Sequence, residues 1–369
     1  MARHASDQAR GEEAPSMRVS HGAPLGPLTT LGIGGPAATL AELTDPADFP
    51  EFVALADGCP GDPVCLGEGS NVLVGDLGCA SAVLRMNTRG IRIGSADADG
   101  RVRVTVQAGH PLTDLVATTV AEGLSGMEML AGIPGTTGAT PVQNVGAYGQ
   151  EVADTMVEVT AWDWRRRRTV RLDASACGLG HRTSVFKHSR RWVLLTLVFA
   201  LRRSGLSTEI TYPTVARQLD IPLGGRVPQA EAAEAVLAVR RRRGMVLCGT
   251  NTESRSIGSV FLSPEVSPAE ADRLRALDAP VNRFPDGSSR VSASWLIREA
   301  GFGLGHRLAP GVRISSLHYT LVADDGARAA DFSAAVDLVG RRVLDRTGVR
   351  LVPEIDFIGE GRRPAVVPG

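Results

Sequence analysis

The chain has 369 residues, of which 43% are hydrophobic and 22% are charged, and 40 basic side chains balance 40 acidic ones. This composition is typical of a globular protein with a substantial core, and the neutral charge argues against a nucleic-acid binder. The longest apolar run, residues 192–201, is about half the length of a membrane span, so we expect no membrane partner.

The first part of the chain predicts a mixed α+β domain over residues 21–205, after a polar and disordered tail at 1–20. Helices are expected at 46–56, where Asp45 can act as the cap and Pro46 begins the first turn, and at 112–122. Short β-type runs separated by glycine are expected at 64–66, 72–74, 82–86, 102–108, 156–162, 168–172 and 193–201. Strands and helices do not alternate regularly, which excludes a doubly wound sheet.

The pattern changes near residues 203–206, where we expect a second α+β domain to begin. This domain, 206–360, is expected to contain helices at 229–243 and 331–346 and strands at 260–262, 319–322 and 349–358, followed by a tail at 361–369.

The cysteines are five in number and include no CxxC pair, which argues against a disulfide framework and against a metal site. We expect reduced, buried thiols in a cytoplasmic protein. The five are Cys59, Cys65, Cys79, Cys177 and Cys248.

Two glycine-rich loops carry the strongest functional signal. One is GEGSN at 67–71, and the other, at 130–149, contains IPGTTG. Successive backbone N–H groups in such loops can form a nest for an anion such as a pyrophosphate. The alternatives are a tight hairpin for the first loop and an Ω-loop held by its own side chains for the second. Two such loops without metal ligands favour a flavin dinucleotide.

Five segments then occur in order: TLGIGGPA (30–37), LGEGSNVLV (66–74), AGIPGTTGATPVQNVGAYGQE (131–151), RTSVFK (182–187) and LVPEIDFIG (351–359). Together they resemble the UDP-N-acetylenolpyruvoylglucosamine reductase family over nearly the whole chain. The resemblance implies a two-subdomain FAD-binding domain of the vanillyl-alcohol-oxidase (PCMH) type, followed by an α+β substrate-binding domain. It also implies FAD and NADPH as cofactors and a sugar nucleotide as substrate.

By the same resemblance, the cofactor-binding residues lie in the two loops and at the end of the helix at 229–243. They are Gly67, Glu68, Gly69, Ser70, Asn71, Ile133, Pro134, Gly135, Thr136, Thr137, Gly138, Gln143, Asn144, Gly146, Ala147, Tyr148 and Arg240.

Three residues match the catalytic positions of the family. Arg182 would stabilise charge that develops on the substrate carboxylate, Ser259 would donate the proton, and Glu354 would polarise Ser259. The competing interpretations are a surface arginine, a turn or cap serine, and an exposed edge-strand carboxylate. Asp356 is the local rival of Glu354, because strand alternation places both on one face.

Substrate contacts are implied for Tyr212, Arg243, Ser263 and Lys187, with a loop anchor and a helix C-terminus as the alternatives for the first two and with holding its own loop as the alternative for Lys187. The match weakens at His181, Leu262 and Ser263, which stand where the family has other residues. These departures leave open a related reductase acting on a different enolpyruvyl compound, and a non-catalytic nucleotide-binding protein. An O₂-using oxidase with flavin attached through His110 is a further alternative. We expect a monomer.

Overall fold

The computed structural model describes residues 17–247, 252–284, 287–361 and 364. Most of the two expected tails, and Cys248, lie outside this part of the chain. The expected boundary of the N-terminal tail at residue 20 is wrong, because β1 (Arg18–Pro24) pairs antiparallel with β2 (Pro36–Leu43). The side chains of β1 are largely exposed, so its hydropathy gave no strand signal, whereas main-chain pairing holds it in place.

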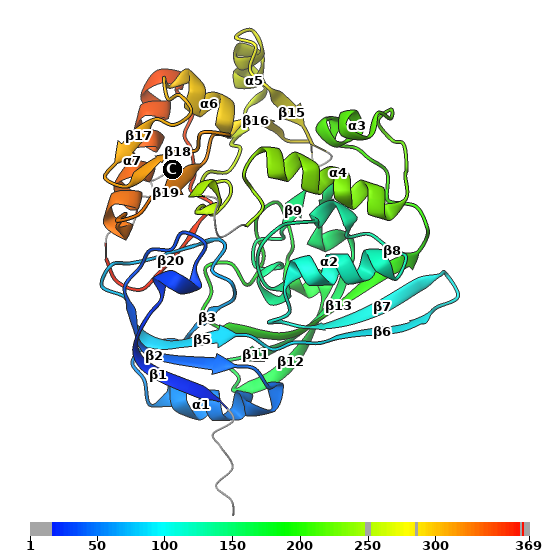
Figure 1. The fold of residues 1–369 in the computed structure, drawn as a ribbon, viewed down its shortest axis with the longest axis vertical. Coiled ribbons are helices and arrows are strands. Elements are labelled where there is room, and N and C mark those ends of the chain that lie inside the picture. The colour runs from blue at the N-terminus through cyan, green and yellow to red at the C-terminus, as the bar shows by residue number, and fades with distance from the viewer. Residues whose placement is uncertain (1–16, 248–251, 285–286, 362–363, 365–369) are drawn as a thin grey trace, which may run out of the picture.

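The first sheet has the strand order β1-β2-β5-β3, with β3 at Val64–Leu66 and β5 at Cys79–Met86. Helix α1 (Phe49–Asp57) covers one face and buries Phe52 completely. As expected, Asp45 acts as a cap by accepting from Ala47 N at 2.8 Å, although it caps the 3₁₀ turn η2 (Pro46–Asp48) that precedes α1. This sheet lies directly above α1 in Figure 1.

The second sheet has the order β12-β11-β13-β7-β6, with a short strand β8 also paired to β13. Their bounds are β6 Ile91–Ala96, β7 Arg101–Gln107, β8 Leu124–Ser125, β11 Met156–Asp163, β12 Arg168–Asp173 and β13 Trp192–Arg203. The helices that share this core are α2 (Leu112–Ala121), α3 (Pro213–Leu219) and α4 (Gln229–Arg242). A two-stranded hairpin, β9 (Gly146–Ala147) with β10 (Gln150–Glu151), lies in the loop region between them.

Helices α3 and α4 were expected to begin the second domain, but they pack into the core of the first. Val215 of α3 and Val236 of α4 are fully buried in the same cluster as β7 and β13. By packing, the division of the chain therefore follows α4 and does not lie near residues 203–206 (Figure 1).

The C-terminal part contains two three-stranded sheets, ordered β14-β16-β15 and β17-β18-β19, with three helices. Their bounds are β14 Glu265–Val266, α5 Pro268–Arg275, β15 Val281–Arg283, β16 Ser289–Val291, α6 Ala293–Glu299, β17 Arg307–Ala309, β18 Val312–Ile314, β19 Leu321–Ala323 and α7 Ala329–Thr347. The strand expected at 260–262 is only an isolated bridge between Phe261 and Pro353.

Seven short 3₁₀ turns complete the described elements. Besides η2, they are η1 Gly26–Leu28, η3 Glu128–Leu130, η4 Thr137–Ala139, η5 Val152–Asp154, η6 Ala174–Cys177 and η7 Thr252–Ser254.

The last strand returns to the first part of the molecule. Strand β20 (Asp356–Ile358) pairs in parallel with β4 (Val72–Val74), the strand that follows the 67–71 loop. Strand β3, which precedes that loop, belongs to a different sheet, so the hairpin interpretation of GEGSN is wrong. Asp76 adds a second link by accepting from Ala329 N and Ala330 N, at 2.8 and 2.9 Å, at the start of α7. The C-terminal segment is thereby held against the glycine-rich loops.

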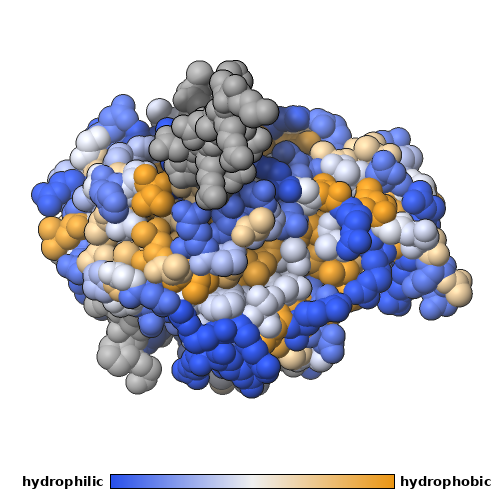
Figure 2. Space-filling model, turned by 90° about the horizontal axis from the view of Figure 1, so that it is seen from below, coloured by the Kyte–Doolittle hydropathy of each residue, from blue (hydrophilic) through white to orange (hydrophobic). Residues whose placement is uncertain are grey.

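The surface and the cysteines of the described residues give little further information about function. No helix in the described ranges is both long and apolar enough to cross a bilayer, and these ranges hold no cluster of His, Cys, Asp or Glu suited to a metal ion. The described cysteines are all free; Cys79 and Cys177 are buried as expected, whereas Cys65 is exposed. On the face shown in Figure 2, hydrophobic residues appear in separate groups between hydrophilic ones.

Candidate active site

Arg182 and Glu354 form an ion pair, although 171 positions separate them along the chain. Arg182 Nε lies 3.2 Å from Glu354 Oε1, and Arg182 Nη2 donates to Gly146 O at 2.9 Å. Arg182 has a left-handed backbone, with φ at 54°, in a tight turn closed by a bridge between Gly180 and Thr183. This turn directs the guanidinium at the C-terminal segment, so Arg182 is not an unattached surface arginine.

Glu354 is buried, with 6% of its surface exposed, so the interpretation as an exposed edge carboxylate is wrong. Burial raises the pKa of its carboxyl group, and nearby Asp356 raises it further. The positive charges of Arg182 and Lys187 act in the opposite direction but do not cancel the effect of burial on the pKa. A carboxyl group with a raised pKa keeps its proton to a higher pH than an ordinary glutamate does.

Ser259 lies beside this pair through the main chain. Glu354 N donates to Val260 O at 2.8 Å, and the Thr320 hydroxyl donates to Gly258 O, so both neighbours of Ser259 are anchored. Ser259 itself is exposed and caps none of the described helices. Within the described residues its hydroxyl has no hydrogen-bond partner, so Glu354 makes no direct hydrogen bond to it. The hydroxyl is therefore available to a ligand.

The two glycine-rich loops lie against each other. Gly135 N donates to the Glu68 carboxylate at 2.9 Å, and the Ser70 hydroxyl donates to Pro134 O at 3.3 Å. A Cβ at Gly67 would overlap the Thr136 side chain, and Gly69 has a φ of 62°. The glycines of the first loop thus permit close packing of one loop on the other as well as a left-handed turn.

The backbone N–H groups distinguish the two loops. Those of Glu68, Gly69 and Ser70 donate no hydrogen bond within the described protein, which leaves three successive donors for an anion. In the second loop, by contrast, Thr137 N donates to His110 O and Gly138 N to Ala108 O, both at 2.7 Å. Gly135 N is also engaged, by the Glu68 carboxylate, so three amides of the loop bond to other segments, and a similar nest at 133–138 stays a prediction.

Asn71 and Lys187 share the same two acceptors. Asn71 Nδ2 donates to Gln143 Oε1 at 2.7 Å and to Glu354 O at 3.4 Å. Lys187 Nζ donates to the same two oxygens, at 3.3 and 3.1 Å. This closed set joins four segments that are far apart in the sequence.

The end of the second loop is held by its own polar groups. Asn144 is 1% exposed, and its amide is fully used: Nδ2 donates to Gly180 O at 3.1 Å and Oδ1 accepts from Ala153 N at 2.9 Å. Asn144 therefore supports the turn that carries Arg182. The part from Gly146 to Ala147 forms strand β9, which offers Gly146 O to Arg182.

Tyr148, Tyr212 and Arg240 meet at the start of α3 and the end of α4. The rings of Tyr148 and Tyr212 are in edge contact, with centroids 5.2 Å apart, and Tyr212 is 38% exposed. Arg240 is buried beside Tyr148 and donates to Gly132 O at 3.1 Å; burial lowers the pKa of its guanidinium. Arg240 therefore braces the second loop and does more than complement the end of its helix.

Two residues near this place were not identified from the sequence. His318 lies close to Arg243, and burial together with that positive charge lowers the pKa of its imidazole to about 4. His188 Nδ1 lies 3.2 Å from Asp356 Oδ1. Both are isolated histidines without a motif, so only the packing of distant segments could identify them.

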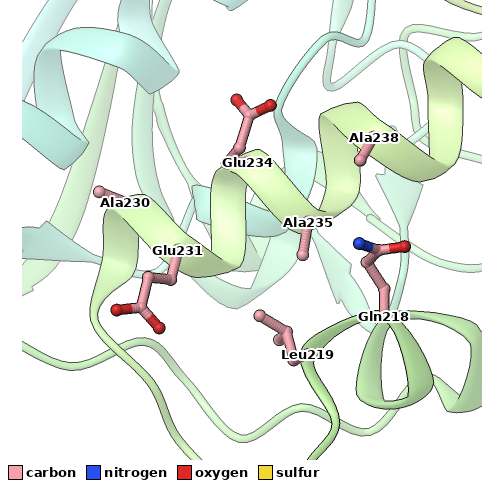
Figure 3. Close-up of a pocket in the computed structure, with 7 residues that line it drawn as sticks. All are labelled: Gln218, Leu219, Ala230, Glu231, Glu234, Ala235 and Ala238. Atoms are coloured by element: carbon pink, nitrogen blue, oxygen red, sulfur yellow. The ribbon is translucent and has the colours of Figure 1, made fainter.

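Some predicted residues are not brought to the centre. Ser263 is exposed, and no contact joins it to the Arg182–Glu354 pair within the described residues. His181 also lies on the surface, with its ring 6.1 Å from that of Phe284. A hollow of about 640 Å³ between α3 and α4 contains none of the predicted site residues (Figure 3).

Comparison with known proteins gives consistent results along the chain. A family model described as an FAD binding domain matches residues 37–172, and one described as the UDP-N-acetylenolpyruvoylglucosamine reductase C-terminal domain matches residues 250–358. Reductases of that name from Salinispora arenicola and Thermobifida fusca are 42% and 43% identical to the chain, covering 88% and 91% of it and 92% and 97% of the relatives. The crystal structure of the Thermus caldophilus reductase matches with a TM-score of 0.62 and 26% identity, over 93% of this chain and 99% of that one.

Proposed function

Because the chain belongs to the UDP-N-acetylenolpyruvoylglucosamine reductase family, we propose that it uses FAD and NADPH to reduce UDP-N-acetylglucosamine enolpyruvate to UDP-N-acetylmuramate. This reaction is a step of peptidoglycan synthesis. The observation that carries the proposal is the 3.2 Å ion pair between Arg182 and Glu354, with Ser259 held next to it by the main chain. A non-catalytic binding protein would have no need of this arrangement.

The first glycine-rich loop fits the pyrophosphate of FAD. The free N–H groups of Glu68, Gly69 and Ser70 supply donors, whereas the Glu68 carboxylate is occupied by Gly135 N. Ile133, Pro134 and the segment 143–148 would then line the ring system, with Arg240 bracing them. When bound, FAD would carry the hydride from NADPH to the terminal vinyl carbon of the substrate.

The protein residues handle the charge and the proton of the reaction. Hydride addition to the vinyl carbon places negative charge on the neighbouring carbon and its carboxylate. The Arg182 guanidinium is planar and permanently charged, so it suits this developing carboxylate enolate. Ser259 would deliver its hydroxyl proton to the carbon, and the resulting alkoxide would take a proton back from Glu354. Because the two groups share no direct hydrogen bond here, this return would pass through a bridging water or follow a shift of the side chains on substrate binding.

Tyr212 and Arg243 are proposed to contact the diphosphate of the sugar nucleotide. Tyr212 is partly exposed on the segment leading into α3, and Arg243 ends α4 beside His318. Ser263 is exposed and its side chain is shorter than that of asparagine, so it would contact the sugar nucleotide only once that substrate has bound.

We further propose a cytoplasmic monomer. Size-exclusion chromatography with light scattering would test the oligomeric state.

The test is an NADPH oxidation assay with the purified, yellow protein. NADPH consumption should depend on UDP-N-acetylglucosamine enolpyruvate and should yield one UDP-N-acetylmuramate for each NADPH. A protein that releases FAD on denaturation but shows no substrate-dependent NADPH oxidation would contradict the proposed substrate. A protein that cannot take up FAD would contradict the cofactor as well.

A further inference from the structure

Lys187 is the only lysine of the chain, whereas the other 39 of its 40 basic residues are arginines. Its side chain is 11% exposed, so the ammonium group is nearly removed from solvent. A chain that uses arginine everywhere else has kept lysine at this one position. The geometry around Nζ gives a physical reason.

Three acceptors surround the ammonium group. Nζ lies 3.3 Å from Gln143 Oε1, 3.1 Å from Glu354 O and 3.9 Å from Asp356 Oδ1. A lysine ammonium is compact and has three donors that point in different directions, whereas a guanidinium is planar and presents its donors as a fork. Acceptors from two separate segments, grouped around one point, suit the ammonium.

Two of these oxygens are also bonded by Asn71, so Lys187 completes a four-membered set. Asn71 lies at the end of the 67–71 loop, Gln143 in the second glycine-rich loop, and Glu354 two residues before β20. Asp356 N also donates to Asn71 O at 3.1 Å. Removing the ammonium would leave the buried Glu354 carbonyl with a single long bond to Asn71.

We propose that Lys187 is a positioning residue: its ammonium group fixes the main chain of Glu354 to the cofactor loops and holds the carboxylate against Arg182. We assign it no phosphate, because two of its three donors already bond to protein oxygens and the third lies on the side of the Asp356 carboxylate. Of the two roles expected from the sequence, this extends the holding of the loop and departs from the substrate contact. The effect on turnover rests on the proposed function; the effect on the geometry of Glu354 does not.

The charges around Glu354 define the expected pH behaviour. Burial and Asp356 raise the pKa of Glu354, while Arg182 and Lys187 lower it; His188 Nδ1 lies 3.2 Å from Asp356 Oδ1, the oxygen that Lys187 also approaches. Replacing Lys187 with Met removes one of the two lowering charges. The pH-dependent limb of kcat that belongs to Glu354 should therefore move to higher pH in this variant.

The kinetic test compares Lys187→Met and Lys187→Arg with a control, Arg217→Met, which removes an exposed positive charge from the surface of α3. We expect kcat to fall about tenfold or more in Lys187→Met, with the KM for the sugar nucleotide within about threefold of wild type. Lys187→Arg should restore little of the activity, because its fork does not match the acceptors. A KM raised tenfold or more at unchanged kcat, or full activity in Lys187→Arg, would overturn the proposal.

A second measurement does not depend on activity or on a folded variant at position 187. In FAD-loaded wild-type protein labelled with ¹⁵N-lysine, NMR gives one Nζ signal. We expect slowly exchanging ammonium protons, a shift of the signal in Asp356→Asn, and no shift on adding UDP. A fast-exchanging signal that responds to UDP and not to Asp356→Asn would refute the positioning role. If the wild type shows no turnover, the proposed function fails while this signal still decides the role of Lys187.

Discussion

At the scale of single residues, the most informative group is the Arg182 guanidinium. It is fixed by Glu354 Oε1 and Gly146 O, so its position is set before any substrate binds. Preorganised charge of this kind contributes to catalysis because it needs no rearrangement in the transition state.

We therefore predict that Arg182→Ala lowers kcat by about 10² to 10³-fold. Arg182→Lys should recover only part of this loss, because a single ammonium cannot contact Glu354, Gly146 O and the substrate carboxylate together. Steady-state assays at saturating NADPH check both variants. Retention of more than about a tenth of the wild-type kcat in Arg182→Ala would contradict the role of charge stabilisation.

Glu354 gives a prediction about stability and pH. Its pKa is raised in the folded protein, so the charged form disfavours folding. The contribution of Glu354 to stability is present below the ordinary pKa of glutamate and is lost as the pH rises through the raised value. The Tm of Glu354→Gln relative to wild type should therefore increase with pH.

Glu270 provides the matched control for this pH dependence. Its pKa is lowered by the Ser267 hydroxyl and main chain in a capping box at the start of α5. Its contribution is present above the ordinary pKa and is lost as the pH falls. Thermal unfolding of Glu270→Gln should thus show the opposite trend, and the same trend in both variants would contradict the assignment for Glu354.

Sequence motifs identified Arg182 and Glu354, but they did not reveal what the neighbouring groups do. RTSVFK and VPEIDF mark the two residues, whereas the shared acceptors of Asn71 and Lys187 arise from four segments whose contact no local pattern encodes. For the same reason the sequence could not reveal that Thr137 N and Gly138 N, within the nest expected at 133–138, bond to His110 O and Ala108 O.

At the scale of elements, the parallel pairing of β20 with β4 positions the segment that carries Glu354. The link is tight: a Cβ at Gly75 would overlap the main-chain oxygen of Glu360. Gly75→Ala should displace β20, lower stability by about 1–3 kcal/mol and speed amide exchange in β20. Hydrogen exchange and thermal unfolding measure these changes.

Gly340→Ala is the control for this glycine. Gly340 lies within α7, where a Cβ would meet no atom within 4 Å. The alanine should leave β20 unchanged and raise stability by roughly 0.5–1 kcal/mol through its better helix propensity. Equal effects of the two substitutions would show that close packing at Gly75 is not what holds β20.

A second element, the β11–β13 pair, is fixed by Asp163 and Arg191. Arg191 donates to Asp163 through Nε at 2.9 Å and Nη2 at 2.6 Å, and these bonds hold the pKa of the Asp163 carboxyl at about 2. We predict that Asp163→Asn lowers the Tm at pH 7 by about 5 °C. Because the pKa is lowered, the difference should persist down to about pH 4 and shrink as the pH approaches 2. A difference independent of pH would contradict an ionic origin.

Most element positions in the first part of the chain could be predicted, although β1, β2 and β6 were missed, and those in the last part could be predicted less well. Strands β3 and β4 have their expected bounds, because short apolar runs between glycines leave little choice. The small strands β14 to β18 were missed, since each has only two or three residues and depends on its partners for stability. Of the strand expected at 349–358, only β20 (Asp356–Ile358) forms, because only these residues have a strand partner in β4.

At the scale of the whole molecule, the C-terminal part packs against the glycine-rich loops. Its core includes Leu31, Ile33 and Leu73 from the first part of the chain, so the two parts share buried surface. The sequence suggested a division near 203–206 because composition changes there, but α4 packs on α2 and η3, and α3 packs on α4, so both helices belong to the core of the first part. A change of residue composition along the chain does not fix a domain boundary. The boundary depends on the core into which each helix packs.

The central claim is that three distant side chains act together in the reduction of the substrate. Rapid-mixing measurements on Ser259→Ala test it most directly, by recording the bleaching of flavin absorbance by NADPH and its recovery on adding UDP-N-acetylglucosamine enolpyruvate. We predict that bleaching stays within about twofold of wild type and that recovery slows by about 10²-fold or more, because only the second step needs the proton. Recovery at the wild-type rate, or an equal loss in both steps, would contradict the account.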